Sequence, residues 1–156
     1  MLAERLPSIL PDLTFDESLE TCALRSIVGV GGQKAISELA TKRPFEAPHH
    51  TASLTSLIGG GASLPSPGLV SLANHGVLFL DEAPEFQRPI LEALRQPLES
   101  GEVLISRTAG LARFPARFQL IMAANPCPCG RFSGNGRACA CPSSARLAYL
   151  AKLSGP

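Results

Sequence analysis

The stretch GVLFLDEAPEF, residues 76–86, combines a short apolar run with a pair of acidic residues. The run VLFL, residues 77–80, has the length and character of a β-strand that is buried on both faces. Asp81 and Glu82 follow it directly. Ligands of open α/β sheets bind beyond the carboxyl ends of the strands, so both carboxylates are expected at a binding edge.

A carboxylate pair at this position suits phosphoryl transfer. An aspartate such as Asp81 can hold Mg²⁺ through water, and a neighbouring glutamate such as Glu82 can orient the attacking water. A second apolar run, Phe118–Ala124, predicts another buried parallel strand and brings Asn125 to the same edge, where its amide can contact a γ-phosphate. The alternative is that the two acids only stabilise the first turn of the next helix.

Composition bounds the class of protein. With 156 residues, 45% hydrophobic and 17% charged, the chain suits one globular domain. A net charge of +1 gives no global argument for nucleic acid, so any such contact requires a local basic patch. No apolar run approaches the ~18 residues of a membrane span, and the N-terminus lacks the pattern of a signal peptide. We therefore expect a cytoplasmic protein with no membrane contact.

The sequence around Thr14 predicts the start of a helix. Thr14 and Glu17 form the pattern of a capping box, and Gly29 is placed to end the helix. Its apolar residues recur at helical spacing: Leu19, Cys22, Ala23 and Ile27.

Other expected elements are a helix over 1–10 ended or kinked by Pro7, a short helix over 33–40, an irregular segment from 43 to 74 with GGG at 59–61, a helix over 87–98, a hairpin of strands 103–106 and 111–114, and a helix over 143–153.

Four of the five cysteines are crowded into one loop, as Cys127, Cys129, Cys139 and Cys141. Four thiolates can bind Zn²⁺ tetrahedrally and hold a polar, glycine-rich loop together. The C-x-C pairs are tighter than the C-x₂-C of common zinc sites, so reduced free thiols and disulfides remain as alternatives.

The three histidines do not make a convincing metal site. His49, His50 and His75 lack a further ligand in the pattern, so they are interpreted as loop histidines that hydrogen-bond to backbone and seat the segment around them.

Basic residues concentrate around the predicted hairpin, as Arg107, Arg113 and Arg117. Such a hairpin can grip the phosphates of DNA, with binding that weakens steeply with salt. The alternative is a solvated hairpin with ordinary surface charge.

Several segments occur together and in order: RPFEAPHHTAS, LIGGG, GLVSLANHGVLFLDE, RQPLESGEVLISR, PARFQLIMAANPCPCG and the final LSGP. In this combination the chain resembles the magnesium-chelatase-related AAA+ ATPases, most closely the bacterial ComM (YifB) group, over essentially its whole length. The resemblance implies a partial α/β AAA+ P-loop NTPase core with a mostly parallel sheet flanked by helices. It also implies ATP and Mg²⁺ as ligands, a homo-oligomeric ring, typically a hexamer, and work on DNA during recombination and natural transformation.

The resemblance also assigns parts of the chain. Asp81 and Glu82 resemble the Walker B pair, which binds Mg-ATP and activates water, and Asn125 resembles the sensor-1 residue. Residues 103–114 resemble the pre-sensor-1 hairpin, with Arg107 and Arg113 as its DNA-contacting residues, and 45–75 resemble the insertion around the second helix.

Two features of the family are missing from the sequence. No G-x-x-x-x-G-K-[ST] phosphate loop occurs, and the chain stops where relatives continue to an arginine finger and a helical lid. We therefore expect a chain truncated at both ends, inactive alone, with very weak ATP binding. The family's strand order then leaves 118–124 as an open sheet edge, which predicts dimers or aggregation.

Two other functions fit the same residues. One is a magnesium chelatase motor subunit that drives metal insertion into a porphyrin. The other is an inactive, zinc-stapled remnant that binds partners only, which zinc content without nucleotide affinity would favour.

Overall fold

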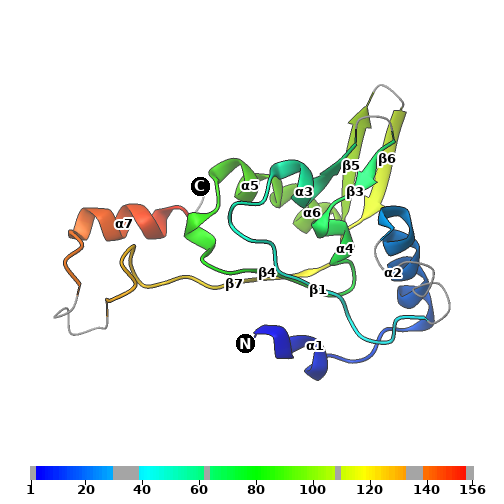
Figure 1. Cartoon of the computed structure of the whole chain (residues 1–156), viewed down its shortest axis with the longest axis horizontal. Coiled ribbons are helices and arrows are strands. Elements are labelled where there is room, and N and C mark those ends of the chain that lie inside the picture. Colours follow the sequence, from blue (N-terminus) through cyan, green and yellow to red (C-terminus); the bar gives the residue numbers. More distant parts are fainter. Residues whose placement is uncertain (1–2, 30–38, 62–63, 108–109, 133–138, 154–156) are drawn as a thin grey trace.

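A computed structural model describes residues 3–29, 39–61, 64–107, 110–132 and 139–153. At its centre three parallel strands pair in the order β1-β4-β7. These are β1 (Phe45–Glu46), β4 (Val77–Leu80) and β7 (Gln119–Met122). Figure 1 shows helices gathered along one side of these strands and a long hairpin projecting at one end. The predicted α/β class, a parallel sheet flanked by helices with hairpin insertions, is therefore confirmed.

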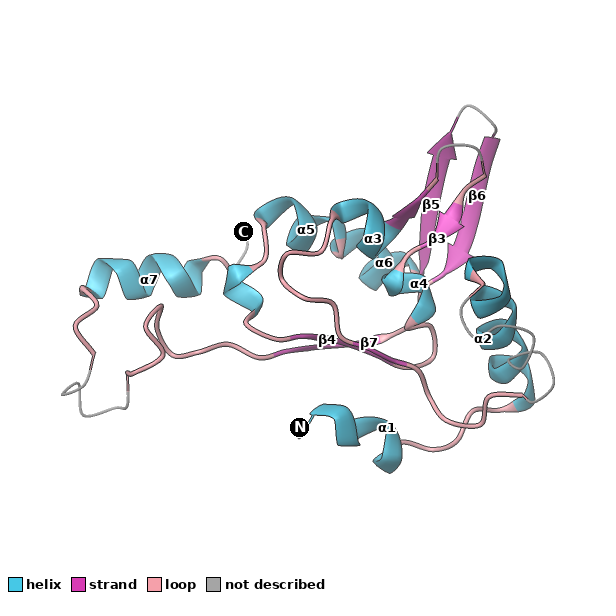
Figure 2. Cartoon of the chain, viewed as in Figure 1, coloured by secondary structure: helices cyan, strands magenta, loops and turns pink. Residues whose placement is uncertain are grey.

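The remaining elements are short (Figure 2). The helices are η1 (Ala3–Arg5), α1 (Leu6–Ile9), α2 (Phe15–Val28), α3 (Leu54–Ile58), α4 (Leu69–Leu72), η3 (Ala83–Glu85), α5 (Arg88–Ala93), α6 (Arg95–Ser100) and α7 (Ser143–Ala151). The antiparallel pairs are β2 (Gly59–Gly60) with β3 (Ser66–Pro67), and β5 (Glu102–Arg107) with β6 (Gly110–Pro115).

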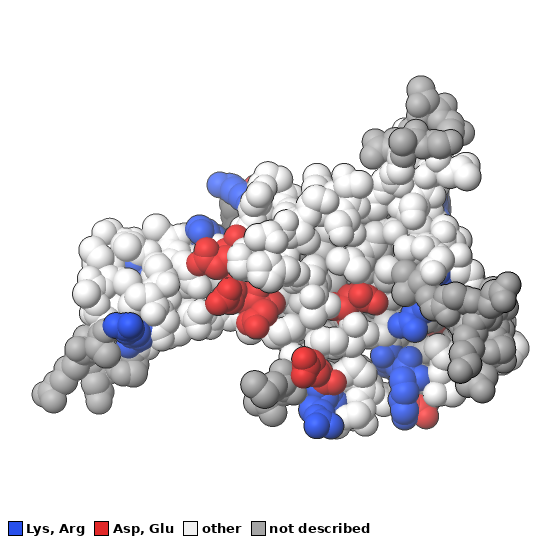
Figure 3. Space-filling model, viewed as in Figure 1, with Lys and Arg blue, Asp and Glu red and all other residues white. Residues whose placement is uncertain are grey.

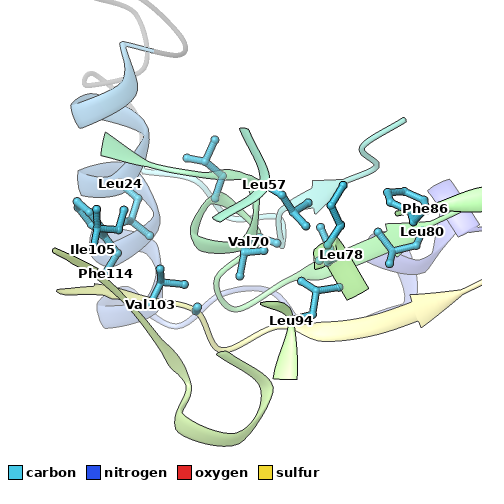
Figure 4. Close-up of a cluster of buried hydrophobic side chains, with 14 of the residues drawn as sticks. Leu24, Leu57, Val70, Leu78, Leu80, Phe86, Leu94, Val103, Ile105 and Phe114 are labelled. Carbon is cyan, nitrogen blue, oxygen red and sulfur yellow. The ribbon is translucent and has the colours of Figure 1, made fainter. Parts of the chain in front are cut away.

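Strand β4 is the centre of the sheet and of the core. Leu78 and Leu80 are fully buried, and they lie in Figure 4 beside Leu57, Val70 and Leu94 from the covering helices. Burying a leucine side chain stabilises the folded state by ~1.5–3 kcal/mol, so this apolar run fixes the position of the strand. The prediction of a buried strand at 77–80 is confirmed.

Helix α2 begins and ends where the sequence predicts, but it buries a different face. Both hydrogen bonds of the capping box are present, and Gly29 ends the helix in the left-handed conformation with φ 70°. The predicted apolar positions Leu19 and Ile27 are exposed, whereas Ser18 and Thr21 are buried beside Leu24. Burial of the two hydroxyls is tolerated because each donates a hydrogen bond to a backbone carbonyl.

Proline explains two differences from the predicted helices. The helix expected over 87–98 is two helices, α5 and α6, that meet at Leu94. Pro97 has no N–H to donate, and its ring conflicts with the carbonyl four residues earlier. Pro7, expected to end or kink a helix, instead lies in the first turn of α1, where a missing N–H costs nothing. The helix expected over 33–40 lies mostly outside the described residues.

The segment 43–74 is more regular than predicted, because it holds β1, α3, α4 and the β2–β3 pair. Glycine makes the tight pairing feasible. A Cβ on Gly59, which has φ 110°, would lie 2.5 Å from the carbonyl oxygen of Ser66. Gly59 therefore allows a close approach of the two backbones that a side chain would block.

The hairpin and the last strand follow the prediction in position. Strand β5 pairs with β6 from Glu102–Pro115 to Arg107–Gly110. Strand β7 pairs in parallel with β4, but only its central residues are half-buried and Met122 is 47% exposed. Among the described strands β7 therefore forms an edge of the sheet rather than the fully buried strand that its composition suggests.

Candidate functional site at the carboxyl edge of the sheet

Asp81 and Glu82 lie exposed at the end of β4. The backbone N–H of Glu82 donates to Asp81 Oδ1 at 3.0 Å. Glu82 has left-handed backbone angles, φ 50° and ψ 44°, which are uncommon for a residue with a side chain. At this turn the chain leaves the sheet and enters η3. The side chains of Asp81 and Glu82 are therefore exposed to solvent.

Asn125 comes to the same edge from β7. Beyond the last strand pair, the N–H of Ala123 donates to Leu80 O at 2.9 Å, and the N–H of Ala83 donates to Ala123 O at 2.8 Å. These two bonds extend the pairing of the strands to the start of the acidic turn. Asn125 is exposed two residues further on. Figure 3 shows acidic side chains gathered on this part of the surface.

His50 faces the acidic turn, which the sequence analysis did not foresee. Its Nδ1 lies 3.7 Å from Glu82 Oε2, an ion-pair distance when the ring is protonated. The ring stacks on His49 with centroids 4.0 Å apart and meets Phe86 edge-on at 6.5 Å. The signal that could have found His50 is β1, since residues that follow a parallel strand reach the edge where its neighbours end.

Of the other two histidines, His49 bonds to backbone as predicted, whereas the ring of His75 contacts carboxylates. His49 accepts a hydrogen bond from the backbone N–H of Thr51 at 3.3 Å. His75 donates its backbone N–H to Arg117 O and lies with Nε2 2.7 Å from Glu20 Oε2. That contact lowers the pKa of the Glu20 carboxyl, and both histidines hold loops in place.

Tyr149 joins the C-terminal helix to this edge and was also missed. Burial raises the pKa of Tyr149, and the nearby carboxylates of Glu85 and Glu82 raise it further. A hydrogen bond with the backbone of Asn125 acts in the opposite direction. Lys152 Nζ donates to Pro84 O at 2.9 Å, so α7 is fastened to η3 as well. An isolated tyrosine in a helix pattern carries no sequence signal for this role.

The donor set at the edge fits Mg²⁺. Two exposed carboxylates and a nearby amide supply oxygen ligands and leave room for the waters that Mg²⁺ retains. The sequence contains no G-x-x-x-x-G-K-[ST] motif, whose backbone N–H groups would cradle phosphates. The exposed oxygen donors at this edge are of the kind that Mg²⁺ takes in proteins.

The four loop cysteines come together in space. All four sulfur atoms lie within 4.8 Å of one another. Burial raises the pKa of the Cys127 thiol, but hydrogen bonds from Cys129 and Cys139 lower it to about 6. For Cys139, the backbone N–H of Cys141 lowers the pKa, but burial and the neighbouring thiols raise it to about 12. The four cysteines that the sequence crowds into one loop thus also lie together in space, and zinc binding by them stays a prediction. All five cysteines of the chain are free of disulfides.

Two of the three arginines around the hairpin have described side chains: Arg113 lies on β6 and Arg117 lies beyond its end. Arg113 is exposed and lies with Nη1 3.5 Å from Glu102 Oε2 across the hairpin. The backbone of Arg107 pairs with Gly110, and its side chain is outside the described residues. Arg117 lies at the base of the hairpin, where its backbone N–H donates to Asn74 Oδ1 at 2.8 Å.

Within the described part of the chain, the helices are too short or too polar to cross a bilayer.

A parallel α/β sheet with an acidic pair after one strand and an asparagine after the next is typical of the AAA+ class of P-loop proteins. The chain belongs to the family described as magnesium chelatase, subunit ChlI, whose sequence profile matches residues 1–156. It is 49% identical over 156 residues to the YifB protein of Escherichia coli K12 and 50% identical over 157 residues to the competence protein ComM of Haemophilus influenzae. Each alignment covers the whole chain and 30% of the relative.

Likeness to the chelatases themselves is more limited. The magnesium-chelatase 38 kDa subunit of Rhodobacter capsulatus is 36% identical over 69 residues, which are 44% of this chain and 20% of that subunit. A cryo-electron-microscopy structure of the complex between the BchI and BchD subunits of magnesium chelatase superposes with a TM-score of 0.50 at 26% identity. It covers 62% of this chain and 32% of that one. The chain thus spans 30% of the length of YifB and ComM.

Proposed function

We propose that this chain supplies the metal- and water-handling core of a ComM-like AAA+ ATPase that acts on DNA. The observation that carries the proposal is the meeting of Asp81, Glu82 and Asn125 at one edge of a parallel sheet. Likeness to YifB and ComM over the whole of these 156 residues supports the choice of family branch.

Each residue has one role in the proposed hydrolysis. Asp81 would hold Mg²⁺, which would supply charge neutralisation at the phosphates of a bound ATP. Glu82 orients the attacking water and accepts its proton, and His50 at 3.7 Å holds the Glu82 side chain toward the site. Asn125 contacts the γ-phosphate or the water. The phosphate cradle and the arginine finger would come from outside these 156 residues, the finger from the neighbouring subunit of a ring.

DNA is the proposed partner, with the β5–β6 hairpin as the contacting element. The hairpin projects away from the sheet (Figure 1), and Arg107 and Arg113 lie on its two strands. The name of the Haemophilus influenzae relative, a competence protein, supports this partner over a porphyrin. A chelatase motor is the second candidate, but the chelatase subunit of Rhodobacter capsulatus matches only 44% of the chain.

The hydrolysis proposal can be tested in a chimera. Residues 1–156 would replace the segment of Escherichia coli YifB to which they align, since the alignment covers the whole of this chain. We expect Glu82→Gln to abolish ATP turnover while fluorescent-ATP binding persists. The matched control is Glu85→Gln, an exposed acid three residues further on, which should keep turnover. Unchanged turnover in Glu82→Gln, or equal loss in both variants, would contradict the role of Glu82.

The DNA proposal has its own test in the same chimera. Replacing Arg107 and Arg113 by alanine should weaken DNA binding and flatten its salt dependence, by ~0.9 in the log–log slope per lost phosphate contact on duplex DNA. The control is Arg88→Ala, because Arg88 is exposed on α5 and paired with Glu92 at 2.7 Å. An unchanged slope in the double variant would remove the hairpin from the DNA interface.

A further inference from the structure

We infer that Cys127, Cys129, Cys139 and Cys141 bind one structural Zn²⁺ ion, which holds together the C-terminal arm of the chain. The arm is defined as residues 123–132 with 139–153, which run from the end of β7 through α7 (Figure 1). This metal site is separate from the proposed ATPase chemistry and stands on different residues.

The spacing of the sulfur atoms fits a tetrahedral metal. Cys127 Sγ lies 3.4 Å from Cys129 Sγ and 3.5 Å from Cys139 Sγ, and the last two lie 3.6 Å apart. The Sγ of Cys141 lies within 4.8 Å of the other three. A Zn–S bond of ~2.3 Å implies sulfur–sulfur edges of about 3.8 Å in a regular tetrahedron. Three mutually near-equal distances fit this arrangement better than two separate disulfide pairs, in which each sulfur would approach a single partner.

The backbone around the cluster is arranged to stabilise thiolates. The N–H of Cys141 donates to Cys139 Sγ at 3.4 Å, and backbone groups of Phe132 and Cys129 hydrogen-bond to the Cys127 sulfur. Gly130 has φ 70° and its N–H donates to Cys127 O at 3.0 Å, which folds the first C-x-C pair into a tight turn. N–H donors to ligand sulfurs are the outer-shell contacts that orient the ligands of metal sites.

In the described structure, few side chains besides Lys152, which donates to Pro84 O at 2.9 Å, hold the arm to the rest of the chain. Tyr149 is the one residue of α7 that is buried, while Leu147 is 70% exposed and Leu150 is 45% exposed. Arg146 stacks over Phe132 at 4.4 Å, a contact worth only ~0.5–1 kcal/mol at an exposed site. A metal that ties the two C-x-C pairs would fix the start of α7 relative to β7 without a larger core.

Four protein thiolates also define what kind of site this is. They fill every position of a tetrahedral metal and leave none open for substrate or water, so the site is structural. Soft sulfur ligands in tetrahedral array select Zn²⁺ or iron, and they exclude Mg²⁺ and Ca²⁺, which require oxygen.

The decisive experiment is metal analysis of the chain purified under reducing conditions without chelator. We expect one zinc per chain by mass spectrometry. Cys139→Ser should lose it, whereas Cys22→Ser should keep it, because Cys22 lies on α2 and outside the cluster. Replacement by Co²⁺ should give the thiolate charge-transfer bands and intense visible absorption of a tetrahedral Co²⁺ site.

A measurement on the unmutated chain decides the case where Cys139→Ser does not fold. Titration with an organomercurial should release one zinc as four thiols are consumed, with Cys22 reacting separately. Five freely reactive thiols with no zinc, stoichiometric iron instead, or retention of zinc by a folded Cys139→Ser would each overturn the inference. None of these readouts depends on nucleotide, so failure here is distinguishable from failure of the ATPase proposal.

Discussion

Replacing Gly76 with alanine tests whether the strand that presents the acidic pair is fixed by backbone contact. An ideal Cβ at Gly76 would lie 2.1 Å from Pro44 O and 2.8 Å from Pro44 C and N. The obstacle is backbone, so no side-chain rotation relieves it. The same carbonyl accepts a hydrogen bond from the N–H of Val77 at 2.9 Å, and Gly76 O accepts one from Gln119 at 2.9 Å. The strand must therefore move away from one of its neighbours.

The expected cost follows from these contacts. Overpacking typically costs ~1–3 kcal/mol, and a weakened backbone hydrogen bond adds ~0.5–1.5 kcal/mol. Alanine also lowers the conformational entropy of the unfolded chain, which stabilises the folded state by ~0.4–1 kcal/mol. We expect the free energy of unfolding to fall by about 2 kcal/mol, which lowers the Tm by ~4–8 °C for a domain of this size.

Gly29→Ala is the matched control. Gly29 has φ 70°, but nothing lies within 4 Å of an added Cβ, so only left-handed strain applies. That strain costs ~1–2 kcal/mol. The lower entropy of the unfolded chain offsets part of this cost, as it does for Gly76→Ala. Urea unfolding followed by circular dichroism, with equal m-values, gives both numbers. If Gly76→Ala is no less stable than Gly29→Ala, close packing of Pro44 against Gly76 is not what positions β4.

Three further outcomes are expected. Thr14→Ala removes the capping box of α2, so urea unfolding should show a loss of ~1 kcal/mol, and a loss within error of zero would contradict the cap. Burial raises the pKa of the Glu46 carboxyl, with nearby Arg25 opposing it, so ionised Glu46 is unfavourable in the folded state. Glu46→Gln should therefore raise the Tm at pH 7. This gain in Tm should disappear as the pH falls below the usual carboxyl pKa, because Glu46 is then protonated in both the folded and the unfolded chain. A gain that does not depend on pH would exclude burial of the charge as the cause. The open edge of β7 should make the chain self-associate with rising concentration in light scattering, and Met122→Lys should reduce this, while a monomer at all concentrations would contradict an accessible edge.

The parts of the fold that could be predicted from the sequence are those determined by residues close together in the chain. The capping box at Thr14, the stop at Gly29 and the buried run at 77–80 each carry their cause within a few residues. The buried face of α2 was not foreseen, because Ser18 and Thr21 become good core residues only once their carbonyl partners are in place. Strand β1 was missed because two residues show no periodicity.

Some residues of the candidate site could likewise be predicted from the sequence, and others could not. Asp81, Glu82 and Asn125 could be placed at one edge because parallel strands end together, and that inference needs only the strand directions. His50 was missed together with the two-residue strand β1 that precedes it. Tyr149 reaches the edge through tertiary packing of α7, which no spacing in the sequence encodes. The cysteine pairs were visible as a motif, but their mutual distances depend on how a loop of nine intervening residues closes.

The two sides of the proposed nucleotide site are held by different means. Asp81 and Glu82 follow a strand buried in the core, so their position is fixed by apolar packing. Asn125 lies on the exposed arm, two residues before Cys127, and its backbone contacts Tyr149 of α7. Loss of metal from the cysteines should therefore loosen Asn125 before it loosens the carboxylates. Hydrogen exchange should show this order, with protection lost in α7 and retained in β4 after zinc is chelated.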